Sequence, residues 1–262
     1  MNFEEYNIFK NGIIEPGEMN FDKVVQKKKK ASYLIGIELE FDADSHRDFQ
    51  EDFNYGILYP AIKFLNEEVY TCYDGSLDNG LEVVTLPYTK NEITRRYKNF
   101  INFFKHVKKS FCSRNPGTMG LHFHVSRKAL NQSQWNILWD FVNNEESRFF
   151  ENISRRKRFV SYDSYYGTSS DAFEFCQFGV KDGKYSAVNM NPDADTVEFR
   201  FFAGTVKYNE FFGSLEVIMG LVDTVRKYGT IDSAKFLKFI NSSKKYENAA
   251  ILVTKNAKHF YN

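Results

Sequence analysis

The chain has few cysteines, which cross-link small domains, and it lacks the proline- or glycine-rich linkers that separate larger ones. Of its 262 residues only three are cysteine, Cys72, Cys112 and Cys176, and they show neither paired spacing nor a CxxC motif. A disulfide framework and a cysteine-type zinc site are therefore disfavoured, and a reducing cytoplasm is the expected location. There is no internal repeat and no proline- or glycine-rich linker. We expect a single domain over 1–262, with 1–31 as a loosely packed arm and 207–262 as a helical C-terminal part.

Long apolar runs and an excess of charge of one sign are also missing. No run approaches the length of a membrane span, and the N-terminus has no signal-peptide pattern. The net charge is only +1, so bulk charge does not favour a nucleic-acid partner. The basic run 27–30 (KKKK) is best interpreted as a solvated loop, whereas for 155–158 (RRKR) a solvated loop and a functional role both stay open. We expect neither membrane nor nucleic acid as partner, and the oligomeric state is open.

Several well-known motifs for nucleotide binding and nucleophilic catalysis are missing. The sequence has no GxxxxGK[ST], no GxGxxG and no GxSxG, and no cysteine stands beside a histidine in a known catalytic pattern. If ATP binds, metals and arginines must hold it rather than a glycine-rich loop. Nucleophilic hydrolase chemistry is not supported.

What is present is an alternation of strand-like and helix-like segments. Period-two patterns predict strands at 33–41, 69–73, 80–86, 119–126, 184–190 and 196–202. Helical periodicity predicts helices over 46–68, with an interruption at Pro60, and over 133–150, 209–228 and the remainder of the chain. A further helix is expected to begin at the capping box formed by Thr89 and Glu92. Residues 154–183 are expected to be irregular. Successive hairpin-like strands predict an α+β fold, with an antiparallel sheet and helices on one face.

Three of these strands carry ionisable residues on the face opposite their apolar residues. The set comprises Glu38, Glu40, His122, His124, Glu198 and Arg200. A solvated sheet face also shows polar alternation, but it usually mixes Thr, Lys, Ser and Gln. Three carboxylates on one face repel each other unless a cation neutralises them. Carboxylate-rich ligands favour Mg²⁺ or Mn²⁺ near phosphate oxygens, although an HxH pair can also serve zinc.

Five segments, taken together and in order, resemble the motif set of a known enzyme family. They are GIELEF (36–41), DGSLDNGLEVVTLP (74–87), GLHFHVS (120–126), KYSAVN (184–189) and TVEFRFFAGT (196–205). The family is the amidoligases, which are ATP-dependent carboxylate–amine ligases similar to glutamine synthetase and glutamate–cysteine ligase in their catalytic core. The resemblance covers residues 33–206, and nothing beyond 206 adds to it.

The resemblance implies a curved, mainly antiparallel sheet whose concave face binds ATP and divalent cations, with helices on the convex face. It implies metal ligands at Glu38, Glu40, Glu82, His122 and Glu198. It implies nucleotide contacts at Arg200, Lys184, His124, Asn189 and Arg158, and catalytic roles for Arg200, Glu40 and Asp74.

Some of these assignments leave alternatives. Asp74 is either a turn former or a substrate contact. Lys184 stands where similar proteins tend to have arginine, which keeps the charge and removes the bidentate fork. The arginine expected ahead of that strand is Arg155, Arg156 or Arg158, and spacing does not decide among them.

The implied reaction is a two-step ligation of a small-molecule or peptide carboxylate with an amine, through an acyl phosphate. Phosphoryl transfer depends on positioning and charge neutralisation, which metals and Arg200 would supply. Three alternatives stay open. They are a zinc hydrolase using His122 and His124, a catalytically inactive binding or structural protein of a larger assembly, and a kinase-like enzyme that stops at phosphorylation.

Overall fold

The computed structural model describes residues 21–43, 60–65, 69–72, 80–109, 111–112, 119–155, 186–192 and 195–257. Its centre is one antiparallel sheet with the strand order β2-β3-β1-β5-β7-β6, and β4 pairs with the end of β1. The strands are β1 (Ile35–Ala43), β2 (Val69–Cys72), β3 (Gly80–Thr85), β4 (Phe111–Cys112), β5 (Gly120–Ser126), β6 (Val188–Asn189) and β7 (Thr196–Ala203). This arrangement confirms the predicted α+β class and the antiparallel sheet.

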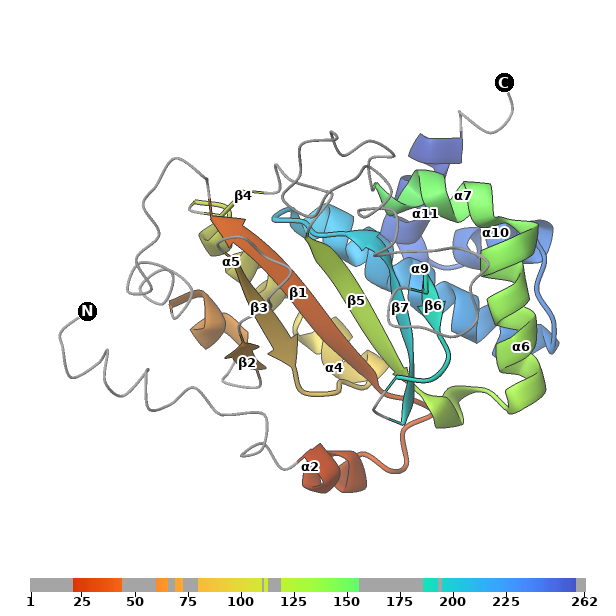
Figure 1. The fold of residues 1–262 in the computed structure, drawn as a ribbon, viewed down its shortest axis with the longest axis horizontal. Coiled ribbons are helices and arrows are strands. Elements are labelled where there is room, and N and C mark those ends of the chain that lie inside the picture. Colours follow the sequence, from red (N-terminus) through yellow and green to blue (C-terminus); the bar gives the residue numbers. More distant parts are fainter. Residues whose placement is uncertain are drawn as a thin grey trace, which may run out of the picture.

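Most helices lie on one side of the sheet, behind it in Figure 1, whereas the helix at 21–27 lies below the sheet and those at 132–140 and 147–154 stand to its right. The α-helices are α2 (Phe21–Lys27), α4 (Lys90–Arg95), α5 (Tyr97–Val107), α6 (Gln132–Asp140), α7 (Ser147–Ser154), α9 (Tyr208–Tyr228), α10 (Ser233–Asn241) and α11 (Glu247–Ala257). Shorter turns are η1 (Lys63–Leu65), η2 (Arg127–Ala129), the π-helical η3 (Phe141–Glu145) and η4 (Lys244–Tyr246).

The apolar face of the sheet forms the core with these helices. In β1, Ile35, Ile37, Leu39 and Phe41 are all buried, as the alternation predicts. The rings of α5 continue the core, and two of them pack on Phe211 of α9 with centroids 4.9 and 5.0 Å apart. Because this face is filled by helices, the charged residues at alternate positions must lie on the other face.

Local signals set several helix ends. Thr89 and Glu92 form the predicted capping box, in which Glu92 N–H donates to Thr89 Oγ1 (3.2 Å) and Thr89 N–H donates to Glu92 Oε2 (2.7 Å). Asn131 and Gln134 form a second one at the start of α6. Each reciprocal pair satisfies backbone donors that a helix start leaves open. The first helical turn of α4 and of α6 is therefore determined by local sequence.

The helix predicted over 133–150 is interrupted. After α6 the backbone widens into η3, where Glu146 N–H donates to Phe141 O (2.9 Å) in an i→i+5 bond, and α7 follows. Phe141 and Val142 are both buried in this segment. Simple helical periodicity does not anticipate the interruption, because a π-turn adds one residue to the regular spacing.

Other expectations are met only in part or lie outside the described residues. Of the strand expected over 184–190, residues 188–189 form β6, and 184–185 lie outside the description. Most of 46–68 and of 154–183 also lies outside it. Within the expected N-terminal arm, residues 21–27 form α2. The long helix expected at 209–228 is confirmed as α9, which ends at Gly229 with φ 72°, a backbone conformation that glycine adopts without strain.

Candidate metal centre on the sheet face

The register of three neighbouring strands brings the charged residues together. In the β1–β5 pair Glu38 stands directly opposite His122, and in the β5–β7 pair His124 stands directly opposite Glu198. Directly opposite residues of an antiparallel pair point to the same face. The predicted clustering of these four side chains is therefore a consequence of strand pairing.

Two imidazoles lie among the carboxylates. His122 Nδ1 is 3.2 Å from Glu38 Oε2 and 4.0 Å from Glu198 Oε1, and its Nε2 is 3.6 Å from Glu40 Oε1. His124 Nε2 is 2.8 Å from Glu38 Oε1 and 3.7 Å from Glu198 Oε1. The result is a compact network of two histidines and three glutamates, most of it buried.

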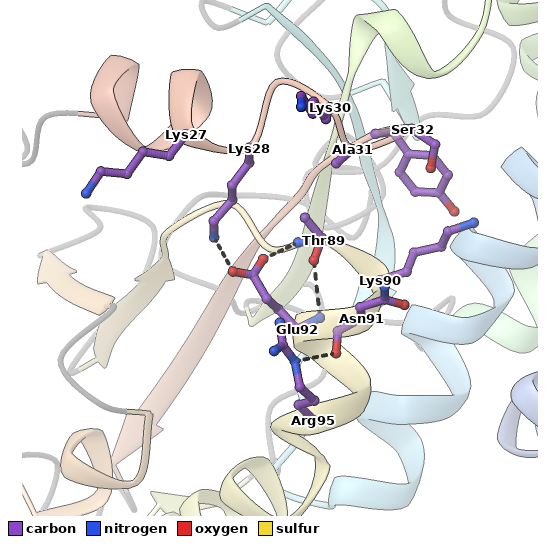
Figure 2. Close-up of a pocket in the computed structure, with 11 residues that line it drawn as sticks. Lys27, Lys28, Lys30, Ala31, Ser32, Thr89, Lys90, Asn91, Glu92 and Arg95 are labelled. Carbon is purple, nitrogen blue, oxygen red and sulfur yellow. Dashed lines mark hydrogen bonds and ion pairs between the residues drawn. The ribbon is translucent and has the colours of Figure 1, made fainter.

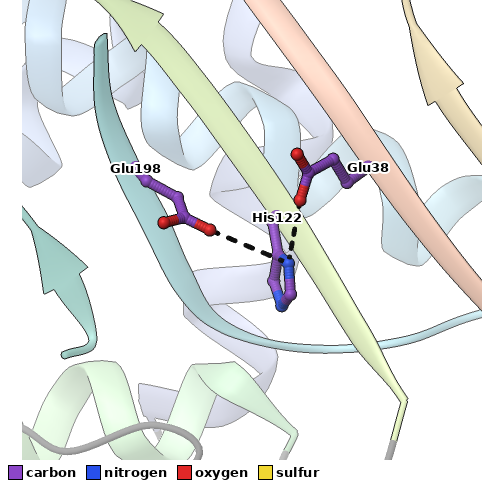
Figure 3. Close-up of side chains that lie close together, drawn as sticks. All are labelled: Glu38, His122 and Glu198. Carbon is purple, nitrogen blue, oxygen red and sulfur yellow. Dashed lines mark hydrogen bonds and ion pairs between the residues drawn. The ribbon is translucent and has the colours of Figure 1, made fainter. Parts of the chain in front are cut away.

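Three of these residues have the spacing of a metal site. One ligand atom each from Glu38, His122 and Glu198 can be chosen so that all lie within 4.8 Å of one another, and Figure 3 shows the three side chains converging from β1, β5 and β7. Ligands about 2.1 Å from one ion are separated by up to roughly 4.2 Å. The trio is therefore close to the separation that one ion requires. Two carboxylates and one imidazole fit Mg²⁺, Mn²⁺ or Zn²⁺ by donor type.

The remaining predicted ligands surround this trio. Glu40 lies beside His122, as given above, and Glu82 is half-buried directly opposite Glu40 in the β1–β3 pair. Glu82 does not belong to the trio that the described residues form. It shares the face of Glu40 on the side of the sheet away from Glu198.

Glu198 is held by two partners. Arg200 Nη1 donates to Glu198 Oε1, and Asn189 Nδ2 donates to Glu198 Oε2 at 3.1 Å. Asn189, predicted as a nucleotide contact, thus lies on β6 as a support for a ligand residue. Such supporting hydrogen bonds fix the orientation of a metal-binding carboxylate.

A β-bulge in β7 shapes the site. Phe123 pairs with Phe199 while Leu121 pairs with Phe202, so Arg200 and one further residue stand opposite the single His122. Strict alternation from Phe199 would place Phe202 on the charged face. The bulge returns Phe202 to the core, where it is fully buried. The alternation of apolar and charged residues along β7 therefore ends just after Arg200, beside the histidine–glutamate cluster.

Gly120 has a role that the sequence reasoning missed. A Cβ atom built at this position would lie 2.2 Å from His122 Nε2, so the ring could not stay where it is. The Gly120 N–H also donates to Glu40 Oε2. The missing side chain thus makes room for the His122 ring, and the backbone orients the neighbouring carboxylate. The only sequence signal is the glycine two residues before the histidine in GLHFHVS.

The charge state of the cluster follows from its contacts. Burial opposes ionisation of Glu38, but the charge of His124 and hydrogen bonds from both histidines outweigh it, and the pKa of Glu38 is held well below its usual range. Burial also opposes protonation of His124, yet the charges of Glu38 and Glu198 raise its pKa. The raised pKa of His124 favours its protonated form, whose positive charge offsets part of the carboxylate charge, and a bound cation would compete with that proton.

Three predicted site residues, Asp74, Lys184 and Arg158, lie outside the described residues, and so does Arg156. Arg155 is described, and it lies at the C-terminal end of α7 with φ 64°. Its guanidinium donates to Glu210 Oε2 (2.7 Å) and to Ala203 O (2.9 Å). These contacts join α7 to α9 and to the end of β7.

Comparison with models of known protein families and with curated protein sequences finds no match to this chain. Among the described residues, none of the helices combines the length and apolar character needed to cross a bilayer. The site itself and the motif resemblance are therefore the features that point to a function.

Proposed function

We propose that the chain is a cytoplasmic, ATP-dependent carboxylate–amine ligase of the amidoligase type, with a divalent cation bound by Glu38, His122 and Glu198. The observation that carries the proposal is the convergence of these three ligand residues within 4.8 Å, with Arg200 hydrogen-bonded to one of them. The ordered resemblance of five motifs supports the choice of ligase chemistry.

Each residue has a defined task in this proposal. Glu38, His122 and Glu198 hold Mg²⁺ or Mn²⁺, and Glu40 and Glu82 extend the carboxylate set toward a further cation. A bound divalent cation supplies charge neutralisation at phosphate oxygens. Arg200 presents a planar guanidinium beside the metal ligands, where it would hold the transferring phosphoryl group. Asn189 keeps Glu198 in place, since it donates to the oxygen that Arg200 does not use.

The reaction that fits these parts has two steps. A substrate carboxylate oxygen attacks the γ-phosphorus of ATP, the bond to the bridging oxygen breaks, and ADP leaves. An amine then attacks the carbonyl carbon of the acyl phosphate, phosphate leaves, and the amine proton passes to a site carboxylate or to the departing phosphate. The largely buried sheet face suits such a transfer because fixed charges act strongly away from water.

A zinc hydrolase is the second candidate, because two imidazoles, His122 and His124, lie side by side among carboxylates. His124 Nε2 is already 2.8 Å from Glu38 Oε1, which favours a role in charge balance over metal ligation. The two candidates differ in a simple requirement, because only the ligase consumes ATP.

Phosphate release from ATP, screened across pools of carboxylic acids and amines with Mg²⁺, Mn²⁺ or Zn²⁺, tests the proposal. We expect release that needs Mg²⁺ or Mn²⁺, an acid and an amine, and that disappears in Glu198→Gln. Glu247→Gln, at an exposed position at the start of α11, is the matched control and should keep full activity. Hydrolysis of an amide or ester with Zn²⁺ and without ATP would replace the ligase with the hydrolase.

A further inference from the structure

A second feature lies away from the charged sheet face, in a hollow of about 400 Å³ between α4 and the segment that joins α2 to β1. Figure 2 shows this hollow and the residues around it. Its charged lining is mostly cationic, consisting of Lys27, Lys28, Lys30, Lys90 and Arg95, with Glu92 as the single carboxylate among the described lining residues.

Glu92 does not neutralise this lining. Its carboxylate lies 3.0 Å from Lys28 Nζ and accepts from Thr89 N–H, as Figure 2 shows. Burial opposes ionisation of Glu92, but these hydrogen bonds outweigh it and lower its pKa. Lys28 also donates to Pro87 O at 2.8 Å. The charges of Glu92 and Lys28 therefore neutralise one another, and both side chains form part of the wall of the hollow.

Lys90 is shared in a different way. Its Nζ lies 2.9 Å from Asp223 Oδ1, above the ring of Tyr33, but Lys245 also approaches Asp223, at 3.4 Å. Asp223 therefore balances part of the charge of Lys90 at the edge of the hollow, and Lys245 is not among the described residues that line it.

The remaining cations have no carboxylate partner within the described part of the chain. Lys27 and Lys30 are exposed and form no ion pair there, and the contact of Arg95 is with a backbone carbonyl, Asn91 O at 3.4 Å. Three cations, Lys27, Lys30 and Arg95, thus line one hollow without a carboxylate partner among the described residues. Like charges around a hollow favour the binding of an anion, which relieves their mutual repulsion.

We propose that this hollow binds a small soluble anion carrying several phosphate groups. A volume of about 400 Å³ falls within the roughly 300–1,000 Å³ range of small-molecule sites. Lysine ammonium groups offer three donors each and suit phosphate as point charges. The one aromatic side chain in the described lining, Tyr33, is buried, so the hollow presents no ring face on which a nucleobase would stack. This inference is independent of the ligase proposal, because it uses none of the metal-centre residues.

Calorimetric titration with sodium tripolyphosphate in the presence of a chelator tests the site, because any phosphate binding that needs a divalent cation is then removed. We expect binding that weakens as ionic strength rises from roughly 0.05 M to roughly 0.5 M. The double variant Lys30→Ala/Arg95→Ala should lower the affinity by about tenfold or more, the range for losing charged hydrogen bonds. The matched control Lys29→Ala/Lys98→Ala removes two exposed cations outside the hollow and should change affinity by less than about twofold.

Equal losses in the two double variants would overturn the proposal, because the effect would then be bulk charge. Absence of binding by the wild-type chain would overturn it as well. Loss of chelator-resistant binding in Arg200→Ala alone would move the anion to the sheet face. Tighter binding to a short single-stranded RNA, or to vesicles containing phosphoinositide, would assign the hollow to a macromolecular or membrane partner. Thermal melting of every variant shows that the fold is retained, since all four substituted side chains are exposed.

Discussion

Gly120 controls how closely the His122 ring can approach Glu40. The substitution Gly120→Ala places a Cβ atom 2.2 Å from His122 Nε2, so the ring must turn away from its present position. We expect Mn²⁺ affinity, measured by calorimetry, to fall about tenfold or more, as for other changes that misplace a ligand. The melting temperature of the metal-free protein should change little, because the group that moves is the end of a side chain.

Gly36→Ala is the matched control for this prediction. A Cβ atom at position 36 would lie 3.5 Å from His124 Cβ, which is ordinary van der Waals contact. Its Mn²⁺ affinity should stay near that of the wild-type chain. Equal affinities of the two alanine variants would show that His122 is not a metal ligand.

Arg200→Lys separates a functional arginine from a structural one. Arg200 shares its face with Glu198 and donates to it. Lysine keeps the positive charge and loses the planar fork. If Arg200 holds the transferring phosphoryl group, turnover should fall about 10²-fold, whereas ATP affinity should change much less because the metal still holds the triphosphate. Phosphate release and nucleotide titration measure the two quantities.

The control for Arg200→Lys is Arg226→Lys. Arg226 lies at the end of α9 and donates to Ala129 O, away from the sheet-face cluster. Its turnover should match the wild-type value. A silent Arg200→Lys change would reduce Arg200 to a partner that merely neutralises Glu198.

At the scale of elements, one carboxylate joins parts of the chain that are distant in sequence. Asp223 of α9 accepts from Tyr33 Oη (3.2 Å), before β1, and from Lys90 Nζ (2.9 Å) of α4. It also accepts from Tyr246 Oη (2.5 Å) and Lys245 Nζ (3.4 Å) of η4. Burial opposes ionisation of Asp223, but its partners outweigh burial, and its pKa is lowered. The carboxylate therefore stabilises the packing of four elements only while it is charged.

Asp223→Asn should lower the free energy of unfolding by about 2 kcal/mol at neutral pH, because it leaves polar partners unsatisfied. Since the folded-state pKa of Asp223 is below the unfolded value of about 3.9, this contribution is fully present above about pH 4. It is lost as pH falls through the lowered folded-state pKa. Urea unfolding at a series of pH values should show the difference between wild type and variant shrinking in acid. A difference that stayed constant into acid would contradict this account, and Asp140→Asn, an exposed position on α6, serves as control.

At the scale of the whole molecule, the proposed metal centre predicts that the stability of the fold depends on divalent cations. The trio draws its members from three strands, so an ion bound there connects β1, β5 and β7. Binding to the folded chain alone stabilises it by about 2.7 kcal/mol at a hundredfold excess over the dissociation constant. For a chain of this size that corresponds to a rise in melting temperature of about 5 °C.

Differential scanning fluorimetry with Mn²⁺ or Mg²⁺, and again after chelation, measures this effect. We expect the rise in wild type, its reversal by the chelator, and its loss in Glu198→Gln. Glu247→Gln should respond like the wild-type chain. A melting temperature that is unchanged by every divalent cation would argue against a metal centre on this face.

Much of the architecture could be predicted because its signals are local. The capping box at Thr89 and Glu92 satisfies backbone donors within one turn, so the helix start follows from four residues. The alternation in β1 separates Ile37 and Leu39 from Glu38 by the pleat alone. These predictions fail where the local geometry is irregular. An extra residue in η3 and another at the β7 bulge shift the regular spacing that simple periodicity assumes.

The sequence by itself determined that β1, β5 and β7 each carry charge on one face, because side chains alternate along a regular strand. Tertiary structure decided which charges meet. Pairing across 84 positions puts Glu38 opposite His122, β6 brings Asn189 to Glu198, and the space above Gly120 admits an imidazole. The sequence predicts that the basic run 27–30 is a solvated loop. The tertiary structure instead places part of it beside α4, where Lys28 pairs with Glu92. These contacts depend on strand partners, register and chain crossings that no local pattern encodes, because residues far apart in sequence interact only after the sheet has formed.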